Sequence, residues 1–161
     1  MRKTNVALKA IAPAEVVLTV TQFRPVLSPE VRGLPSTDYK MCLKKPHRRV
    51  SLKDDTLVVK HPGTTIRLTI ASSVDDKTKY YPAGITFVRE EGKRLSDVEL
   101  LGQKAFLQRR IVIDGQTLTF SNRFKKGKDV VPYKFSVIIQ RGLDGAIGII
   151  DPRILDIGTL P

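Results

Sequence analysis

An alternating stretch at residues 57–70 constrains the fold more than any other part of the sequence. Apolar and polar side chains alternate on both sides of Pro62 and Gly63, and many of these residues are β-branched. After the glycine, the apolar positions are Ile66, Leu68 and Ile70. This period of two predicts a strand with one buried and one solvent-facing side. Proline followed by glycine predicts a turn or bulge between two strands.

Similar strand patterns recur along the chain. We predict further strands at residues 15–23, 85–88, 110–120, 131–141 and 146–154. Asp114 and Gly115 divide one of them into a hairpin, because this pair supplies the positive φ of a type I′ turn. Ser96 and Glu99 have the spacing of a capping box, so residues 95–108 predict one short helix, or an irregular crossover because Gly102 disfavours a helix.

Short strands separated by turns predict an all-β fold, a two-sheet antiparallel sandwich of immunoglobulin-like or jelly-roll-like type with one short helix. A length of 161 residues fits one domain. Residues 1–15 are basic and lack a period, which predicts an N-terminal arm, and residues 16–161 form the sandwich domain. Within it, residues 24–49 are a proline-rich basic stretch, either a long connection or an edge element.

A net charge of +12 is the strongest compositional signal, because a basic surface attracts polyanions. Two basic clusters are candidates for a polyanion-binding site. The first contains Lys40, Lys44, Lys45, Arg48 and Arg49, and the second contains Arg123, Lys125, Lys126 and Lys128. Phe124 lies within the second cluster, where it could stack on a base. The two loops form one cationic lip if they project from the same end of the sandwich.

The sequence predicts no metal site, cofactor or catalytic centre. Cys42 and His47 lie among lysines and arginines that repel cations, and no Cys, His or Met follows His61, so the ligand set of a copper site is missing. The paired carboxylates at 54–55, 75–76 and 90–91 fall at predicted turns, where aspartate favours local hydrogen bonds. No Walker loop or Gly-x-Ser-x-Gly elbow is present.

Localisation is predicted from the single cysteine and from hydropathy. Cys42 cannot form an intramolecular disulfide, so a reducing cytoplasm is the simpler setting. No stretch approaches the roughly 18 apolar residues of a membrane span, and no apolar run of signal-peptide length follows Met1. We therefore expect a cytoplasmic protein, or one within a particle that assembles in the cytoplasm.

Two segments resemble known families. Residues 57–70 resemble an early strand pair of cupredoxin-like and immunoglobulin-like sandwiches. Residues 133–137 followed by 150–154 are similar to small bacterial proteins of the DP-EP type, which end in a strand with an Asp-Pro-x-Ile motif, here Asp151, Pro152, Arg153 and Ile154. The resemblance spans roughly residues 50–158. It implies the sandwich fold and brings no activity with it, because sandwiches host many unrelated functions.

The function expected from the sequence is therefore structural. We expect a non-enzymatic subunit of a larger homo- or hetero-oligomeric particle, such as a virus, phage or bacterial assembly, with the arm contacting a neighbouring subunit. The alternative is a module that binds nucleic acid or another polyanion through its basic loops. The expected partners are other copies or other protein subunits, and nucleic acid.

Overall fold

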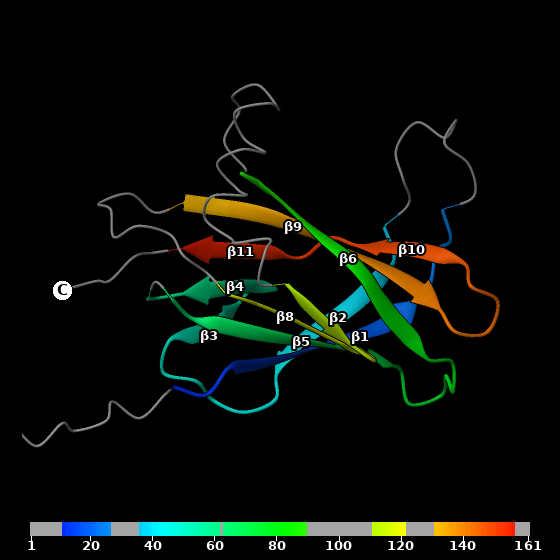
Figure 1. Cartoon of the computed structure of the whole chain (residues 1–161), viewed down its shortest axis with the longest axis horizontal. Helices are drawn as coiled ribbons and strands as arrows, with labels where there is room; N and C mark the ends of the chain where they lie inside the picture. Colours follow the sequence, from blue (N-terminus) through cyan, green and yellow to red (C-terminus); the bar gives the residue numbers. More distant parts are fainter. Residues whose placement is uncertain (1–10, 27–35, 62, 90–110, 122–130, 157–161) are drawn as a thin grey trace, which may run out of the picture.

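The computed structural model describes residues 11–26, 36–61, 63–89, 111–121 and 131–156 (Figure 1). These residues form eleven strands in two sheets and contain no helix, which confirms the all-β class. The helix expected at residues 95–108 lies outside the described residues. The second basic cluster, within residues 122–130, also lies outside them.

The first sheet has five strands. Their order is β2 (Asp38–Leu43), β1 (Ala14–Gln22), β5 (Thr65–Ser72), β8 (Thr117–Ser121) and β7 (Val112–Asp114). The strand predicted at residues 15–23 is thus present, and it begins at Ala14, inside the segment expected to be the arm. Within the proline-rich stretch, β2 forms an edge of this sheet.

The second sheet has six strands. They are β3 (Val50–Lys53), β4 (Thr56–Val59), β6 (Tyr80–Arg89), β9 (Val131–Arg141), β10 (Ile147–Ile150) and β11 (Arg153–Asp156). Strand β9 pairs with β6 along its length, and with β10 and β11 at its two halves. Because a strand has only two edges, β10 and β11 lie end to end on the edge opposite β6. The break at Asp151 and Pro152 separates them, as predicted.

The prediction of purely antiparallel sheets is wrong at two pairings. Strand β1 pairs with β5 in parallel, and β4 pairs with β11 in parallel. The reason lies in the path of the chain, which leaves the first sheet after β2, forms β3 and β4 in the second, and returns as β5. Since β1 and β5 both start at the same end of the molecule, they run in the same direction. Strand periodicity carries no information about this choice.

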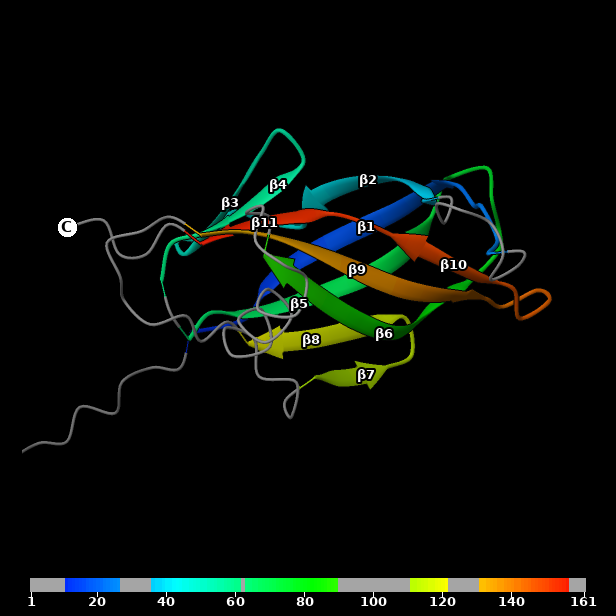
Figure 2. The ribbon, with the colours of Figure 1, turned by 90° about the horizontal axis from the view of Figure 1, so that it is seen from above.

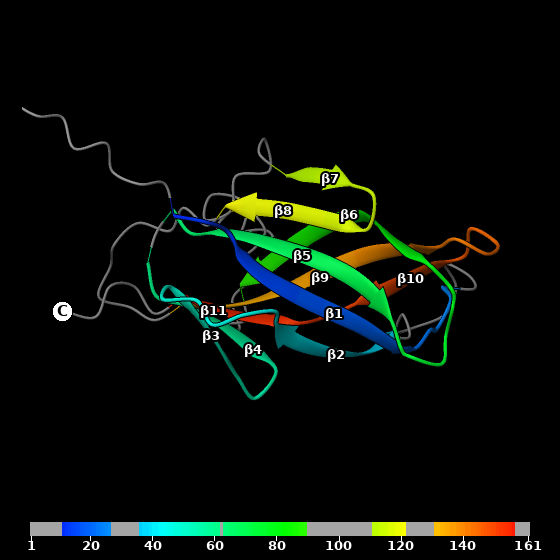
Figure 3. The same cartoon turned by 90° about the horizontal axis from the view of Figure 1, so that it is seen from below.

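The two sheets share one hydrophobic core. Alternate residues of β1, β5, β8 and β9 are buried, among them Leu18, Leu68, Phe120, Phe135 and Ile139. The rings of Phe120 in the first sheet and Phe135 in the second have centroids 6.2 Å apart. Figures 2 and 3 view the molecule from opposite sides, with β6 and β9 in front in one and β1 and β5 in front in the other.

Two short segments tie the first sheet to the outer edge of β10. The N–H of Val26, beyond the end of β1, donates to the carbonyl of Ile147 at 2.8 Å. The N–H of Thr37, just before β2, donates to the carbonyl of Ile149 at 2.7 Å. An unpaired edge would expose backbone donors and acceptors, so these contacts cover part of it. These two hydrogen bonds also join the two sheets at the end of the molecule opposite residues 44–49.

The predicted hairpin between β7 and β8 is present with a shifted turn. Asp114 pairs with Thr117, so the two central residues are Gly115 and Gln116. Of these two, only Gly115 has a positive φ, +54°, which matches type II′ rather than the predicted type I′. Strand β6 also differs from its prediction: it starts at Tyr80, not at residue 85, because a bulge between Pro82 and Gly84 lets the strand continue past the proline.

The β3–β4 turn offers a stability prediction. Its central residues, Asp54 and Asp55, have φ values of +47° and +56°, as a type I′ turn requires, yet neither is glycine. Replacing them with Asn and Gly is expected to stabilise the fold by about 0.5–1 kcal/mol, because the left-handed strain falls. The urea midpoint should rise. In the β7–β8 turn, Gly115→Ala should lower it, and an unchanged midpoint in both variants would show that turn conformation does not limit stability.

Candidate functional site

The backbone brings several strand ends together at one end of the molecule. In the first sheet, Leu43 at the end of β2 pairs with Val16, and Thr65 at the start of β5 pairs with Ser121 at the end of β8. In the second, Val59 at the end of β4 pairs with Val50 and Asp156. The N–H of Lys60 donates to the carbonyl of Arg49 at 2.9 Å and links the two connections between the sheets.

We call this region the basic end, and define it by residues 44–49, 60–64, the adjoining starts of β1 and β5 and the end of β11. Its basic residues are Lys44, Lys45, Arg48, Arg49, Lys60 and Arg67, and its acidic residues are Glu15 and Asp156. The Glu15 carboxylate lies 3.7 Å from the Lys44 ammonium and 3.6 Å from the Arg67 guanidinium. For Lys45, Arg48, Arg49 and Lys60, the described residues place no carboxylate within ion-pair distance.

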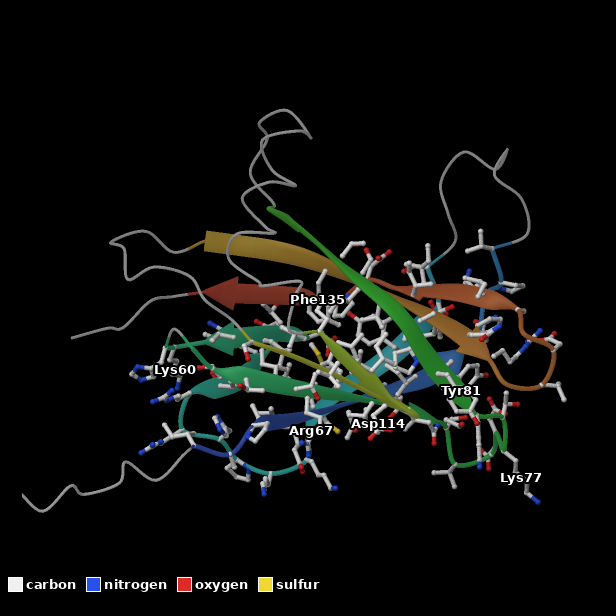
Figure 4. All side chains as sticks on the ribbon, in the orientation of Figure 1. Lys60, Arg67, Lys77, Tyr81, Asp114 and Phe135 are labelled. Carbon is white, nitrogen blue, oxygen red and sulfur yellow. The ribbon has the colours of Figure 1, made fainter. Side chains whose placement is uncertain are left out.

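The first predicted cluster therefore lies together on this end, with one exception. Lys44, Lys45 and Arg48 are exposed and Arg49 is half-buried. Lys40 is the exception, because it lies within β2, opposite Thr19 and farther from this end. It is exposed on the same outer face as Lys44. Figure 4 shows Lys60 at the basic end and Lys77 at the opposite end of the molecule.

The second predicted cluster, Arg123, Lys125, Lys126 and Lys128 with Phe124, lies outside the described residues. The strand ends on either side of this cluster belong to the described residues. Ser121, at the end of β8, pairs with Thr65, and Val131, at the start of β9, pairs with Asp156. Both flanks are at the basic end, so the chain leaves this end before the second cluster and returns to it afterwards.

Two side chains order the basic end from within. The Nδ1 of His47 accepts from the N–H of Arg49 at 3.2 Å, and its Nε2 lies 3.0 Å from the carbonyl oxygen of Ala12. This geometry fits a neutral imidazole with its proton on Nε2. The buried hydroxyl of Thr64 donates to the carbonyl of His61 at 2.6 Å and closes the neighbouring turn. The cations thus project from an organised backbone.

Sequence reasoning missed Lys60 and Arg67 as members of this site. Lys60 is distant in sequence from the first cluster, and Arg67 lies in an alternating stretch, where a polar residue on the solvent-facing side indicates a strand and no site. For Lys60, the sequence contained one clue, which is the position of this residue next to the Pro62–Gly63 turn. Recognising it required the pairing of β4 with β3 and of β5 with β1, which periodicity does not supply.

The potential metal ligands Met41, Cys42 and His47 do not converge on one point. Met41 is buried and its neighbour Cys42 is exposed, because successive side chains of β2 point to opposite faces. His47 is engaged by backbone groups. Within the described part of the chain, no group of three or more His, Cys, Asp or Glu side chains could hold a metal ion.

The opposite end has a different character. Its titratable side chains include Asp38, Asp75, Asp76, Asp114 and Asp144, and also Arg24, Lys77, Lys79 and Arg141. The two signs are nearly balanced, and several members are paired. Arg24 contacts Asp38 at 2.9 Å, and Arg141 contacts Asp144 at 2.6 Å. The excess of positive charge among the described residues thus lies toward the basic end.

A buried tyrosine anchors the opposite end. The ring of Tyr80 stacks on Phe23 at a centroid distance of 5.5 Å, and the Arg141 guanidinium lies 4.5 Å from the centroid of Phe23. The hydroxyl of Tyr80 donates to Asp76 at 2.8 Å. Burial, and then the hydrogen bond to Asp76, raise the pKa of Tyr80 to about 12. Hydrogen bonds from the hydroxyl and the N–H of Thr78, and from Tyr80, lower the pKa of Asp76.

This pair predicts a pH dependence of stability with defined signs. Because the pKa of Tyr80 rises from 10.0 to about 12 on folding, its contribution is complete below pH 10 and is lost as the pH rises through 12. The contribution of Asp76, whose pKa is lowered from 3.8, is lost as the pH falls below that value. Tyr80→Phe is expected to remove most of the alkaline loss. Urea unfolding of both proteins across pH 9 to about 12 measures it, and parallel curves would refute this assignment.

No protein-family model matches the chain, and no curated protein matches it. In the part of the chain that the structure describes, no helix has the length and apolar character needed to cross a membrane.

Proposed function

We propose that this protein is a non-enzymatic β-sandwich that binds a polyanion through its basic end. The observation that carries the proposal is the concentration of six basic residues on two neighbouring connections and the adjoining start of β5, four of them without an ion-pair partner among the described residues. Binding to such a surface gains free energy because the lysines and arginines neutralise phosphates and release the counterions condensed on the polyanion.

The chemistry of the basic end favours recognition of a phosphate backbone. Exposed ammonium and guanidinium groups contact phosphate oxygens, and such contacts bind the backbone without reading the base sequence. We include Arg123, Lys125, Lys126 and Lys128 in the proposed site, because both flanks of their segment lie at the basic end. Phe124 is then the proposed stacking residue. Nucleic acid is the proposed ligand, and the sandwich resemblance to cupredoxin-like and DP-EP-type proteins supplies a scaffold only.

Assembly into a larger particle is a second proposal, which one feature of the first sheet supports. Its edge strand β7 exposes Val112 and Ile113, at 59% and 44%, on its two faces. Exposed apolar edge strands pair with other chains, so β7 is a candidate contact between subunits. An assembled particle that presents its basic ends to nucleic acid would unite both proposals.

The mass of the purified protein at low and high salt, with absorbance at 260 and 280 nm across the same peak, separates the two proposals. A monomer that carries nucleic acid at low salt and releases it at high salt supports polyanion binding. A defined oligomer free of nucleic acid at both salts supports assembly and opposes the first proposal. A monomer free of nucleic acid at both salts, which also fails to bind added duplex DNA, would contradict both.

A further inference from the structure

A pocket opens at the end of the molecule opposite the proposed polyanion site. It has a volume of about 400 Å³ and lies between the β5–β6 connection and the β9–β10 turn. Its lining residues are Lys77, Thr78, Lys79, Tyr81, Gly142 and Leu143. Figure 4 shows Lys77 and Tyr81 together at this end. The volume falls within the range of small-molecule sites.

Gly142 makes the wall of the pocket possible. A Cβ at this position would lie 3.0 Å from Cε2 of Tyr81 and 3.1 Å from the carbonyl oxygen of Lys79. The absent side chain therefore lets the Tyr81 ring lie against the backbone of the turn. The N–H of Gly142 donates to the carbonyl of Lys79 at 2.7 Å, which joins the two segments that line the pocket.

Hydrogen bonds hold both segments in shape without a ligand. In the β9–β10 turn, the Asp144 carboxylate accepts from Arg141 at 2.9 and 2.6 Å and from the N–H of Ala146 at 3.1 Å. In the β5–β6 connection, Asp76 accepts from the N–H of Thr78 at 2.8 Å, and the Ser72 hydroxyl donates to the carbonyl of Thr78. A pocket built on such turns loses little entropy when it binds.

The same bonds leave the pocket's lysines unneutralised. Of the three carboxylates in these two segments, Asp76 and Asp144 are hydrogen-bonded to Thr78, Tyr80 and Arg141, and the third, Asp75, has no ion pair with either lysine. Among the described residues, no carboxylate lies within ion-pair distance of Lys77 or Lys79.

The pocket also presents apolar surface. Leu143 is 81% exposed and Tyr81 is 37% exposed, so both side chains offer area that a ligand could cover. Unpaired ammonium groups next to an aromatic ring and an aliphatic side chain match a ligand that carries a negative charge on an apolar ring.

We propose that this pocket binds a small aromatic anion, with its ring against Tyr81 and Leu143 and its carboxylate or phosphate against Lys77 and Lys79. The same chemistry has two sources: a free aromatic acid, or the C-terminal carboxylate and side chain of a peptide that ends in an aromatic residue. Either ligand engages this site independently of the polyanion proposed for the basic end.

Two probes test the proposal on the full chain labelled with ¹⁵N: 2-naphthoate, and a short peptide that ends in phenylalanine. We expect saturable shifts of the backbone amides of Lys79, Gly142 and Leu143 with at least one probe. Binding of naphthoate identifies a free acid as sufficient, and binding of the peptide alone identifies a protein C-terminus. Absence of saturable shifts at these amides with both probes would overturn the proposal.

Variants locate the contacts. Lys77→Gln with Lys79→Gln is expected to weaken binding by about tenfold or more, because two charge-assisted hydrogen bonds are lost. Lys44→Gln with Lys45→Gln, at the basic end, removes the same charge and should leave the affinity unchanged. The neutral probe 2-naphthamide should bind more weakly than the acid. Equal loss in the two double variants would show general attraction to a basic protein and would reject the site.

Discussion

We expect the protein to lose most of its affinity for a DNA duplex in a triple variant that combines Lys45→Glu, Arg48→Glu and Lys60→Glu. These side chains belong to the basic end, and none has an ion-pair partner among the described residues. Each lost phosphate contact should flatten the slope of log affinity against log salt by about 0.9, so three should flatten it by roughly 2.7. At about 0.1 M salt, the affinity should fall on the order of a hundredfold. Fluorescence anisotropy of a labelled duplex measures both quantities.

A matched variant separates position from total charge. Lys53→Glu, Lys77→Glu and Lys79→Glu change the net charge by the same amount, but these residues lie at the β3–β4 hairpin tip and at the opposite end. The control should keep most of the affinity and a slope close to that of the wild type. If both triple variants lose affinity equally, the protein attracts DNA through its overall charge and the basic end is not a site.

Gly148→Ala is expected to be the most damaging single methyl addition among the described glycines. A Cβ here would lie 2.6 Å from Cε2 of Phe23 and 2.9 Å from Oγ1 of Thr37. Phe23 cannot easily move, because it stacks on Tyr80 and lies beneath Arg141. Overpacking at such a position costs about 1–3 kcal/mol, and the urea midpoint should fall accordingly.

Gly84→Ala is the control for this substitution. Its Cβ would meet only Cδ1 of Ile138, at 3.7 Å, which is ordinary contact, and its φ is not positive. The stability of this variant should stay close to that of the wild type. A Gly148→Ala protein as stable as Gly84→Ala would mean that Phe23 and Thr37 do not pack against β10 as described.

The strands that the sequence predicted best are those with one buried face. Residues 131–141 form β9 with the predicted bounds, and the apolar positions Ile66, Leu68 and Ile70 are buried in β5, which continues to Ser72. Burial forces alternation in these strands, so their pattern is readable from the residues alone. The predicted start of β6 was wrong, because proline usually interrupts a strand. Here a bulge accommodates Pro82, and this distortion depends on the pairing of β6 with β9.

Sheet pairing and the candidate site depended on information that local sequence does not contain. The parallel pairs β1–β5 and β4–β11 follow from where the chain crosses between sheets. The same crossings bring Lys60 beside Arg49 and put Ser121 and Val131 at one end. Sequence analysis could name the first cationic cluster, but only the topology shows which other residues join it.

The most direct test of the central claim, that the basic end binds a polyanion, is a titration of ¹⁵N-labelled protein with a short DNA duplex at low salt. The predicted result is a set of amide shifts concentrated at residues 44–49, 60–64 and 67, which reverse when salt is added. Shifts concentrated instead at residues 73–81 and 141–146, or spread evenly over both ends, would contradict the proposed site.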